Sequence, residues 1–274
     1  MPDTYAAIGN PISHSKSPQI HATFARQTAQ EMLYTLIEGP LGQFKPTVDA
    51  FRATGARGLN ITAPFKLDAF AYAQHLSKRA QLAGAVNAMK FDGEAVYAEN
   101  FDGVGLVRDL QVNLGRPLQG MRVLMLGAGG AARGAALPLL EGAPARLVVA
   151  NRTVSKAQDL ARLCSAFGVI EAVSYFELAN QRFDLVLNAT SASLRGELPA
   201  VPAEVFAADG LAYDLAYGKG LTPFLRLAQS AGTRQVADGV GMLVEQAAEA
   251  FAWWRGIRPK TPEVIRMLTV PLNP

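Results

Sequence analysis

Segment 121–156 restricts the possible folds of this chain more than any other feature of the sequence. Its pattern predicts a strand, a glycine turn, a helix and a second strand. A short apolar run ends in Gly127-Ala128-Gly129-Gly130-Ala131-Ala132, an Ala- and Leu-rich stretch follows, and a second apolar run covers 147–150. This pattern is typical of the first βαβ unit of a dinucleotide-binding domain. Gly127 permits the tight turn and Gly129 lets the backbone approach a pyrophosphate at the helix start.

The residues after the second strand favour NADP over NAD. An NAD site usually places Asp or Glu about 20 residues beyond the glycines, to bind the ribose hydroxyls. Here the chain reads Asn151-Arg152-Thr153, with Lys156 one helical turn after Arg152. Cations beside a hydroxyl and an amide suit a 2′-phosphate, and a guanidinium can also stack on adenine. The alternative interpretation is a basic helix start that faces solvent.

Length and composition exclude several classes of protein. The 274 residues, half of them hydrophobic, suffice for one large or two medium domains. The formal net charge of +3 is spread along the chain, so we expect no nucleic-acid surface. No apolar run reaches the ~18 residues of a membrane span. The single cysteine, Cys164, excludes an internal disulfide and a Cys-rich metal site, which favours the cytoplasm.

The first third of the chain alternates strand and helix signals, which predicts a mostly parallel sheet. A polar loop follows the first strand, and its Ser15 and Ser17 could form a cradle for a carboxylate. Ser17 stands before Pro18, so a helix N-cap is the alternative. The histidines His14, His21 and His75 lack metal spacing, and we expect packing or surface roles for them.

Two charged residues at helix starts are candidates for chemistry. Strand 58–62 leads to Lys66 in the first turn of a helix, where a cation opposes the helix dipole. A residue that opposes a local structural preference at the end of a strand suggests a functional role. The alternative is an ordinary surface lysine. Asp102 begins the helix just before the nucleotide-binding half, either as an N-cap or as a carboxylate in the cleft. Met242 and Gln246, four residues apart, share one helix face.

These motifs together resemble the shikimate dehydrogenase family over nearly the whole chain. The matching segments, in the family's order, are Gly9–Pro18, Asn60–Lys66, Ala83–Asn87, Asp102-Gly103, Gly127–Gly130, Asn151–Thr153, Asn188–Ser191 and Asp238–Ala247. The resemblance implies an α/β protein of two domains: an N-terminal, mostly parallel substrate domain completed by C-terminal helices, and a Rossmann-type NADP domain. We place the first at 1–102 and 240–274, and the second at 103–239.

The resemblance also implies a role for each site residue. Ser15 and Ser17 bind the shikimate carboxylate, Lys66 is the acid/base, and Asp102 orients the reacting hydroxyl. The other residues near the substrate are Thr62, Asn87, Tyr217 and Gln246. The residues that hold the cofactor are Gly127, Ala128, Gly129, Gly130, Ala131, Asn151, Arg152, Thr153 and Lys156, with Thr190, Gly239 and Met242 at the nicotinamide end. We expect no metal, and a monomer or homodimer that acts on a small molecule.

The chain departs from the family at two positions near the expected site. Ala88 and Phe101 stand where the family usually has threonine. We expect Phe101 to reshape the pocket beside Asp102 and to limit shikimate turnover; the alternative is that its ring points into the core. Quinate or a related polyol acid is an alternative substrate. A catalytically silent NADP-sensing regulator is a further alternative, and retention of both Lys66 and Asp102 argues against it.

Overall fold

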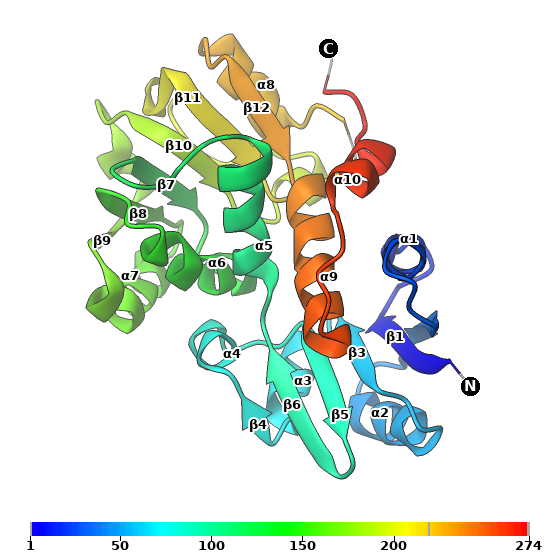
Figure 1. The fold of residues 1–274 in the computed structure, drawn as a ribbon. Helices are drawn as coiled ribbons and strands as arrows, with labels where there is room; N and C mark the ends of the chain where they lie inside the picture. Colours follow the sequence, from blue (N-terminus) through cyan, green and yellow to red (C-terminus); the bar gives the residue numbers. More distant parts are fainter. Residues whose placement is uncertain (1, 219, 273–274) are drawn as a thin grey trace.

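The computed structural model describes residues 2–218 and 220–272, which form two six-stranded sheets with helices around and between them (Figure 1). The first sheet follows the order β2 (Met32–Glu38), β1 (Asp3–Gly9), β3 (Gly58–Ile61), β5 (Ala88–Asp92), β6 (Ala95–Glu99) and β4 (His75–Leu76). β1 runs parallel to β2 and β3, as the sequence predicts. β5 is antiparallel to β3 and β6; its pairing with β6 follows from a connection of only two residues, because a parallel crossover needs many more.

The second sheet has the strand order of a Rossmann domain. It runs β12 (Gln235–Asp238), β11 (Phe206–Asp214), β10 (Phe183–Asn188), β7 (Arg122–Leu126), β8 (Arg146–Ala150) and β9 (Ile170–Val173). Every pair of neighbours is parallel. The chain reverses its direction of progress between β7 and β10, and ligands of such sheets bind beyond the strand ends at this switch point. The dinucleotide-binding fold predicted from the glycine turn is therefore confirmed.

Ten α-helices connect and cover the two sheets within the described residues. They are α1 (Ser17–Gln27), α2 (Phe44–Ala53), α3 (Lys66–Tyr72), α4 (Lys78–Ala83), α5 (Asp102–Arg108), α6 (Gly130–Glu141), α7 (Val154–Cys164), α8 (Pro223–Ser230), α9 (Val240–Arg255) and α10 (Pro262–Leu268). A π-helical turn, Asp109–Asn113, extends α5. Shorter 3₁₀ turns cover Ser165–Phe167, Tyr175–Leu178, Ser193–Arg195 and Ala203–Val205. None of the helices described has both the length and the apolar character to cross a membrane.

Helices α5 and α9 lie side by side between the two sheets (Figure 1). Glycines on α5 permit this close packing. A Cβ atom on Gly105 would come within 2.7 Å of the backbone nitrogen of Gln246 in α9. A Cβ atom on Gly103 would lie 2.2 Å from the carbonyl oxygen of Gly134 in α6. Because no side chain fits such gaps, α5 contacts both helices with its backbone and holds them at fixed positions.

The C-terminal helix α9 packs on α1 beside the first sheet. Phe251 of α9 meets Phe24 of α1 edge to face, with ring centroids 5.8 Å apart, and Val264 of α10 belongs to the same buried cluster. A chain segment from beyond the Rossmann sheet thus returns to the N-terminal sheet. Because of this return, residues of α9 can contact residues of segment 1–102.

His21 of α1 is a packing residue, as expected from the sequence. Its exposed fraction is 0%, and its ring lies nearly parallel to that of Tyr34 at a centroid distance of 4.2 Å. Neither ring nitrogen has a hydrogen-bond partner among the residues described. Burial lowers the pKa of His21 to about 3, with Asn60 opposing the shift. The folded protein therefore keeps this imidazole neutral at pH values where an unfolded chain protonates it.

The buried imidazole predicts an acid-sensitive stability. Between about pH 6.5, where an unfolded histidine titrates, and pH 3, the unfolded state binds one more proton, so stability is lost as the pH falls. From pH 7 to pH 5 this loss amounts to about 2 kcal/mol of the free energy of unfolding. His21→Phe should remove that part of the loss in urea unfolding, whereas His75→Gln, at an exposed site, should not. Equal losses in wild type and His21→Phe would contradict the assignment.

Candidate active site

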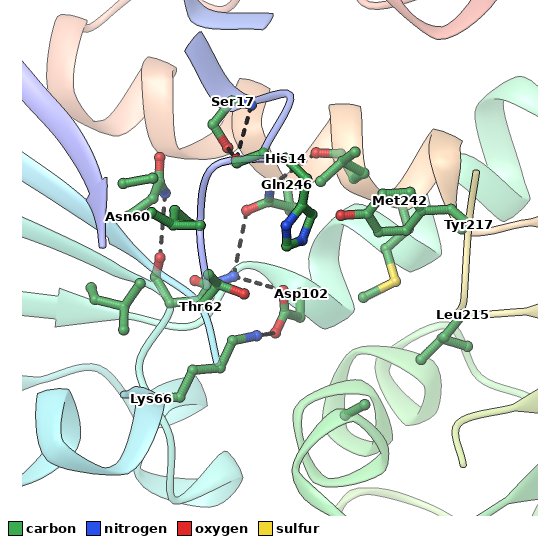
Figure 2. A pocket seen from close by; sticks show the side chains of 18 residues that line it. His14, Ser17, Asn60, Thr62, Lys66, Asp102, Leu215, Tyr217, Met242 and Gln246 are labelled. Carbon is green, nitrogen blue, oxygen red and sulfur yellow. Dashed lines mark hydrogen bonds and ion pairs between the residues drawn. The ribbon is translucent and has the colours of Figure 1, made fainter. Parts of the chain in front are cut away.

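A pocket of about 250 Å³ lies where the first sheet, α9 and the carboxyl end of the second sheet meet (Figure 2). Its lining includes every residue that the resemblance assigned to the substrate, namely Ser15, Ser17, Thr62, Lys66, Asn87, Asp102, Tyr217 and Gln246. Three of the expected cofactor residues, Ala131, Gly239 and Met242, line the same pocket. The elements that carry these side chains come from both halves of the chain, so the fold is what brings them together.

Lys66 and Asp102 form an ion pair in this pocket (Figure 2). The Lys66 Nζ atom donates to Asp102 Oδ2 at 2.5 Å. Both residues begin short helices, and neither makes a capping hydrogen bond: Phe65 and Phe101 occupy the N-cap positions. The N-cap interpretation of Asp102 is therefore wrong, and its carboxylate faces the cleft. The side chain of Lys66 is 33% exposed and that of Asp102 is 14% exposed, so both remain open to a small molecule.

Asn87 connects this pair to α9. Its Nδ2 donates to Asp102 Oδ1 at 2.8 Å and to Gln246 Oε1 at 3.5 Å. Its Oδ1 accepts from the backbone N–H of Phe101 at 2.9 Å, which fixes the orientation of the amide. Asp102 thus has one partner on each carboxylate oxygen, and each oxygen keeps a lone pair for a ligand.

The serine loop after β1 forms another wall of the pocket. Ser15 Oγ donates to Ser17 Oγ at 3.1 Å and accepts from the Ser17 backbone N–H at 3.3 Å. Helix α1 begins at Ser17 itself, with Lys16 in the N-cap position and Pro18 in the first turn. The N-cap interpretation of Ser17 is wrong, and both hydroxyls stay available to a ligand. The amide groups at the start of α1 add to the favourable field for an anion.

Two polar residues line the pocket that the sequence did not single out. His14 lines it from the serine loop (Figure 2) and is exposed, which agrees with the expected packing or surface role for this histidine. Asn60 of β3 lines it as well, although only 8% of the residue is exposed. Neither has a spacing or partner in the sequence that marks it. Tyr217 stands opposite; partial burial raises the pKa of its hydroxyl, and the charge of Asp102 adds to the shift, so it stays a donor.

The glycine turn beyond β7 fits a dinucleotide. Gly127 has φ +104°, a conformation that favours glycine, and its missing Cβ would meet the Ala189 carbonyl at 3.1 Å. A Cβ on Gly129 or Gly130 would meet nothing within 4 Å, so open space lies above the start of α6. Helix α6 begins at Gly130, and its first N–H groups and dipole face that space. A pyrophosphate therefore has both room and donors here.

The ends of β8 and β10 carry the remaining cofactor candidates. Asn151, Arg152, Thr153 and Lys156 follow β8, and no carboxylate stands where an NAD site needs one. Arg152 and Lys156 are exposed on the turn into α7 and its first residues. Thr190 follows β10, where its hydroxyl donates to Asn188 Oδ1 at 2.7 Å. Strands β8 and β10 flank β7, so these residues follow the strands on either side of the glycine turn, and none of them lines the pocket.

Phe101 points away from the pocket, which overturns the expectation that it reshapes it. The residue is 5% exposed and packs with Tyr5, Ala88 and Trp254 in a buried cluster. Its ring meets Trp253 edge to face at 5.8 Å. Ala88 is fully buried in the same cluster, and neither residue lines the pocket. Phe101 occupies the N-cap position of α5 with right-handed helical backbone angles, and this turn into α5 sends its ring to the core and leaves Asp102 in the cleft.

Comparison with known proteins identifies the family. Residues 7–89 match the model of the shikimate dehydrogenase substrate binding domain, residues 110–195 match that of shikimate / quinate 5-dehydrogenase, and residues 239–267 match that of the shikimate 5′-dehydrogenase C-terminal domain. The chain belongs to the shikimate dehydrogenase family. The family resemblance stated from the sequence is therefore confirmed.

Close relatives cover almost the entire chain. A shikimate dehydrogenase (NADP(+)) of Nitrosospira multiformis is 56% identical, with 98% of each chain covered. The crystal structure of an Ael1 enzyme from Pseudomonas putida is also 56% identical and superposes with a TM-score of 0.95, covering 99% of this chain and 100% of that one. The shikimate 5-dehydrogenase of Thermus thermophilus, in complex with NADP(H) and shikimate, is 34% identical with a TM-score of 0.86, covering 97% and 99%.

The location of Phe101 predicts a stability effect rather than a gain in activity. Phe101→Thr removes a buried aromatic ring, and we expect a loss of about 3 kcal/mol in the free energy of unfolding. The kcat/KM for shikimate of the folded fraction should stay within about twofold of wild type, because the ring does not touch the pocket. Urea unfolding and steady-state kinetics on the same preparation test both parts. A marked rise in kcat/KM would restore the pocket hypothesis.

Proposed function

We propose that this protein is an NADP-dependent shikimate dehydrogenase, which interconverts 3-dehydroshikimate and shikimate. The observation that carries the proposal is the Lys66–Asp102 pair, which lies in a pocket between a serine cradle and the switch point of a Rossmann sheet. Relatives at over half identity carry this activity in their names. A polar pocket is thus available for the substrate ring, and a glycine turn is available for the cofactor.

In this proposal the substrate carboxylate binds to Ser15 and Ser17, at the start of α1. Thr62, Asn87 and Gln246 contact the ring hydroxyls, and Tyr217 closes the side toward the second sheet. The Ser15 hydroxyl donates to Ser17, which leaves the Ser17 hydroxyl and the N–H groups at the start of α1 as donors for an anion and supports this orientation. A molecule held at the carboxylate end then presents its far hydroxyl to the ion pair.

Lys66 transfers the proton in the reaction and Asp102 holds the substrate in place. The bound cofactor would supply the hydride as NADPH and accept it as NADP⁺. During reduction of the ketone, the Lys66 ammonium donates a proton to the oxygen as that oxygen gains charge; during oxidation the neutral amine takes the proton back. Asp102 accepts a hydrogen bond from the reacting or adjacent hydroxyl and keeps the ammonium aimed at it. Asn87 holds Asp102 in turn.

The proposed domains follow the two sheets. We assign residues 1–102 and 240–274 to the substrate domain and residues 103–239 to the NADP domain. All strands of the first sheet lie within 3–99 and all strands of the second within 122–238, which supports the division. The packing of α9 on α1 supports the return of the C-terminal helices to the first domain.

For the cofactor, we propose that the first turn of α6 holds the pyrophosphate and that Arg152 and Lys156 hold the 2′-phosphate. Gly127, Ala128, Gly129, Gly130 and Ala131 form the turn around the phosphates. Asn151 and Thr153 border the adenosine, while Thr190, Gly239 and Met242 border the nicotinamide. The open space at Gly129 and Gly130 supports this fit, as does the absence of a carboxylate in the sequence after β8.

A side-by-side assay tests the proposed function. The purified protein should oxidise shikimate with NADP at a kcat/KM at least about tenfold above that for quinate, and above that for shikimate with NAD. A preference for quinate would instead make the protein a quinate dehydrogenase of this family. Cofactor binding without turnover of either acid would support the silent regulator.

The proton-transfer role predicts a large and selective loss of rate. Lys66→Ala should lower kcat by about 10² to 10⁴, the usual range for a lost acid or base, while the Kd for NADP stays within about twofold. Lys45→Ala, which removes an exposed lysine of α2, is the matched control and should change neither value. If Lys66→Ala raised KM for shikimate and left kcat intact, the lysine would be a binding group and the mechanism wrong.

The phosphate-binding role predicts a change in cofactor preference. Arg152→Ala should reduce the ratio of kcat/KM with NADP to that with NAD by about tenfold or more, because a charge-assisted hydrogen bond contributes about 1.5 to 3 kcal/mol. Arg162→Ala is the matched control, since Arg162 is exposed on the helix that follows and pairs with Asp159. An unchanged ratio in Arg152→Ala would overturn the assignment.

A further inference from the structure

A chain of hydrogen bonds behind the pocket leads to Tyr34, a residue that has no role in the proposed mechanism. Asn60 of β3 lines the pocket, but most of the residue is buried. Its Oδ1 accepts from the hydroxyl of Tyr34 on β2 at 2.7 Å, and its Nδ2 donates to the Asn87 carbonyl at 3.3 Å. An amide nitrogen has two N–H groups, so one of them has no partner among the hydrogen bonds of the described residues, and Asn60 belongs to the pocket lining.

Tyr34 is suited to fix which end of that amide faces the pocket. A carbonyl oxygen can only accept a hydrogen bond, so the phenol must be the donor in its bond with Asn60. Removal of the phenol from water raises the pKa of Tyr34 well above its usual range, and a hydrogen bond with Ser17 opposes the shift only in part. The phenol therefore remains a donor.

The ring of His21 stacks on the ring of Tyr34 and holds it in place. The two ring centroids are 4.2 Å apart, and the interplanar angle is 8°. Since burial keeps His21 neutral, this support adds no charge next to the cradle. The stacked pair thus fixes the phenol, and the phenol donates to Asn60 in the pocket wall.

We propose that Tyr34 is a positioning residue for substrate binding: its hydroxyl locks the Asn60 amide so that an N–H, and not the carbonyl oxygen, faces the anionic end of the substrate. The proposal rests on the proposed function. Without the hydroxyl, the longer hydrogen bond from Nδ2 to the Asn87 carbonyl holds the amide less firmly, and an amide that turns over presents a carbonyl oxygen, which repels a carboxylate. The effect falls on the affinity for the acid and leaves hydride transfer and cofactor binding alone.

The chain offers a matched control for the test. Tyr5 of β1 lies directly opposite Tyr34 in the register of the two strands, but its hydroxyl meets Arg255 instead of the pocket. Tyr34→Phe should raise KM for shikimate about tenfold or more, with kcat and the KM for NADP within about twofold of wild type. Tyr5→Phe should leave all three constants within about twofold.

A double-mutant cycle tests whether Tyr34 acts through Asn60. In an Asn60→Ala background, Tyr34→Phe should change KM for shikimate by less than about twofold. The inference fails if Tyr34→Phe matches Tyr5→Phe, if it impairs kcat and NADP binding equally, or if its full effect persists without Asn60. Failure of the proposed function is separate, because wild type would then not turn over shikimate at all.

Discussion

The close packing of α5 against two other helices is the constraint on which the rest of the structure depends. Gly105 brings α5 against the backbone of α9, and Gly103 brings it against α6. Helix α6 carries the first turn of the Rossmann unit, α9 carries Met242 and Gln246, and α5 itself begins at Asp102. Side chains from three distant segments therefore meet within one pocket because two glycines of α5 allow their helices to approach.

This arrangement predicts how a ligand is oriented in the pocket. Hydroxyl and amide donors gather where α1 begins, the ion pair lies beyond them, and the glycine turn of the second sheet follows on the far side. A small acid with a ring hydroxyl fits that order. The Lys66 ammonium would be poorly placed at a helix start on its own, and Asp102 offsets the unfavourable dipole. The pair thus favours the local structure and is also the proposed chemical centre.

Features defined by local sequence were predictable, whereas features that depend on long-range packing were not. Local sequence patterns were enough to predict the glycine turn and the basic residues after β8. They also marked Lys66 and Asp102, because each is a charged residue at a helix start. The roles of Ser17 and Asp102 as N-caps were plausible locally but wrong, because the helices begin at these residues. Asn60 and Tyr34 carry no local signal, since their contact depends on the pairing of β2 and β3 with β1. Phe101 was misjudged because proximity in sequence to Asp102 does not imply a shared face.

The proposed mechanism places the reacting hydroxyl against the Lys66–Asp102 pair. A crystal structure of the protein with NADP and shikimate would show whether it lies there. One ring oxygen should lie within about 3.2 Å of both Lys66 Nζ and Asp102, with the carboxylate on Ser15 and Ser17 and the same ring carbon facing the nicotinamide. A complex in which the substrate carboxylate binds Lys66, or in which the hydroxyl nearest the nicotinamide lies away from the ion pair, would contradict it.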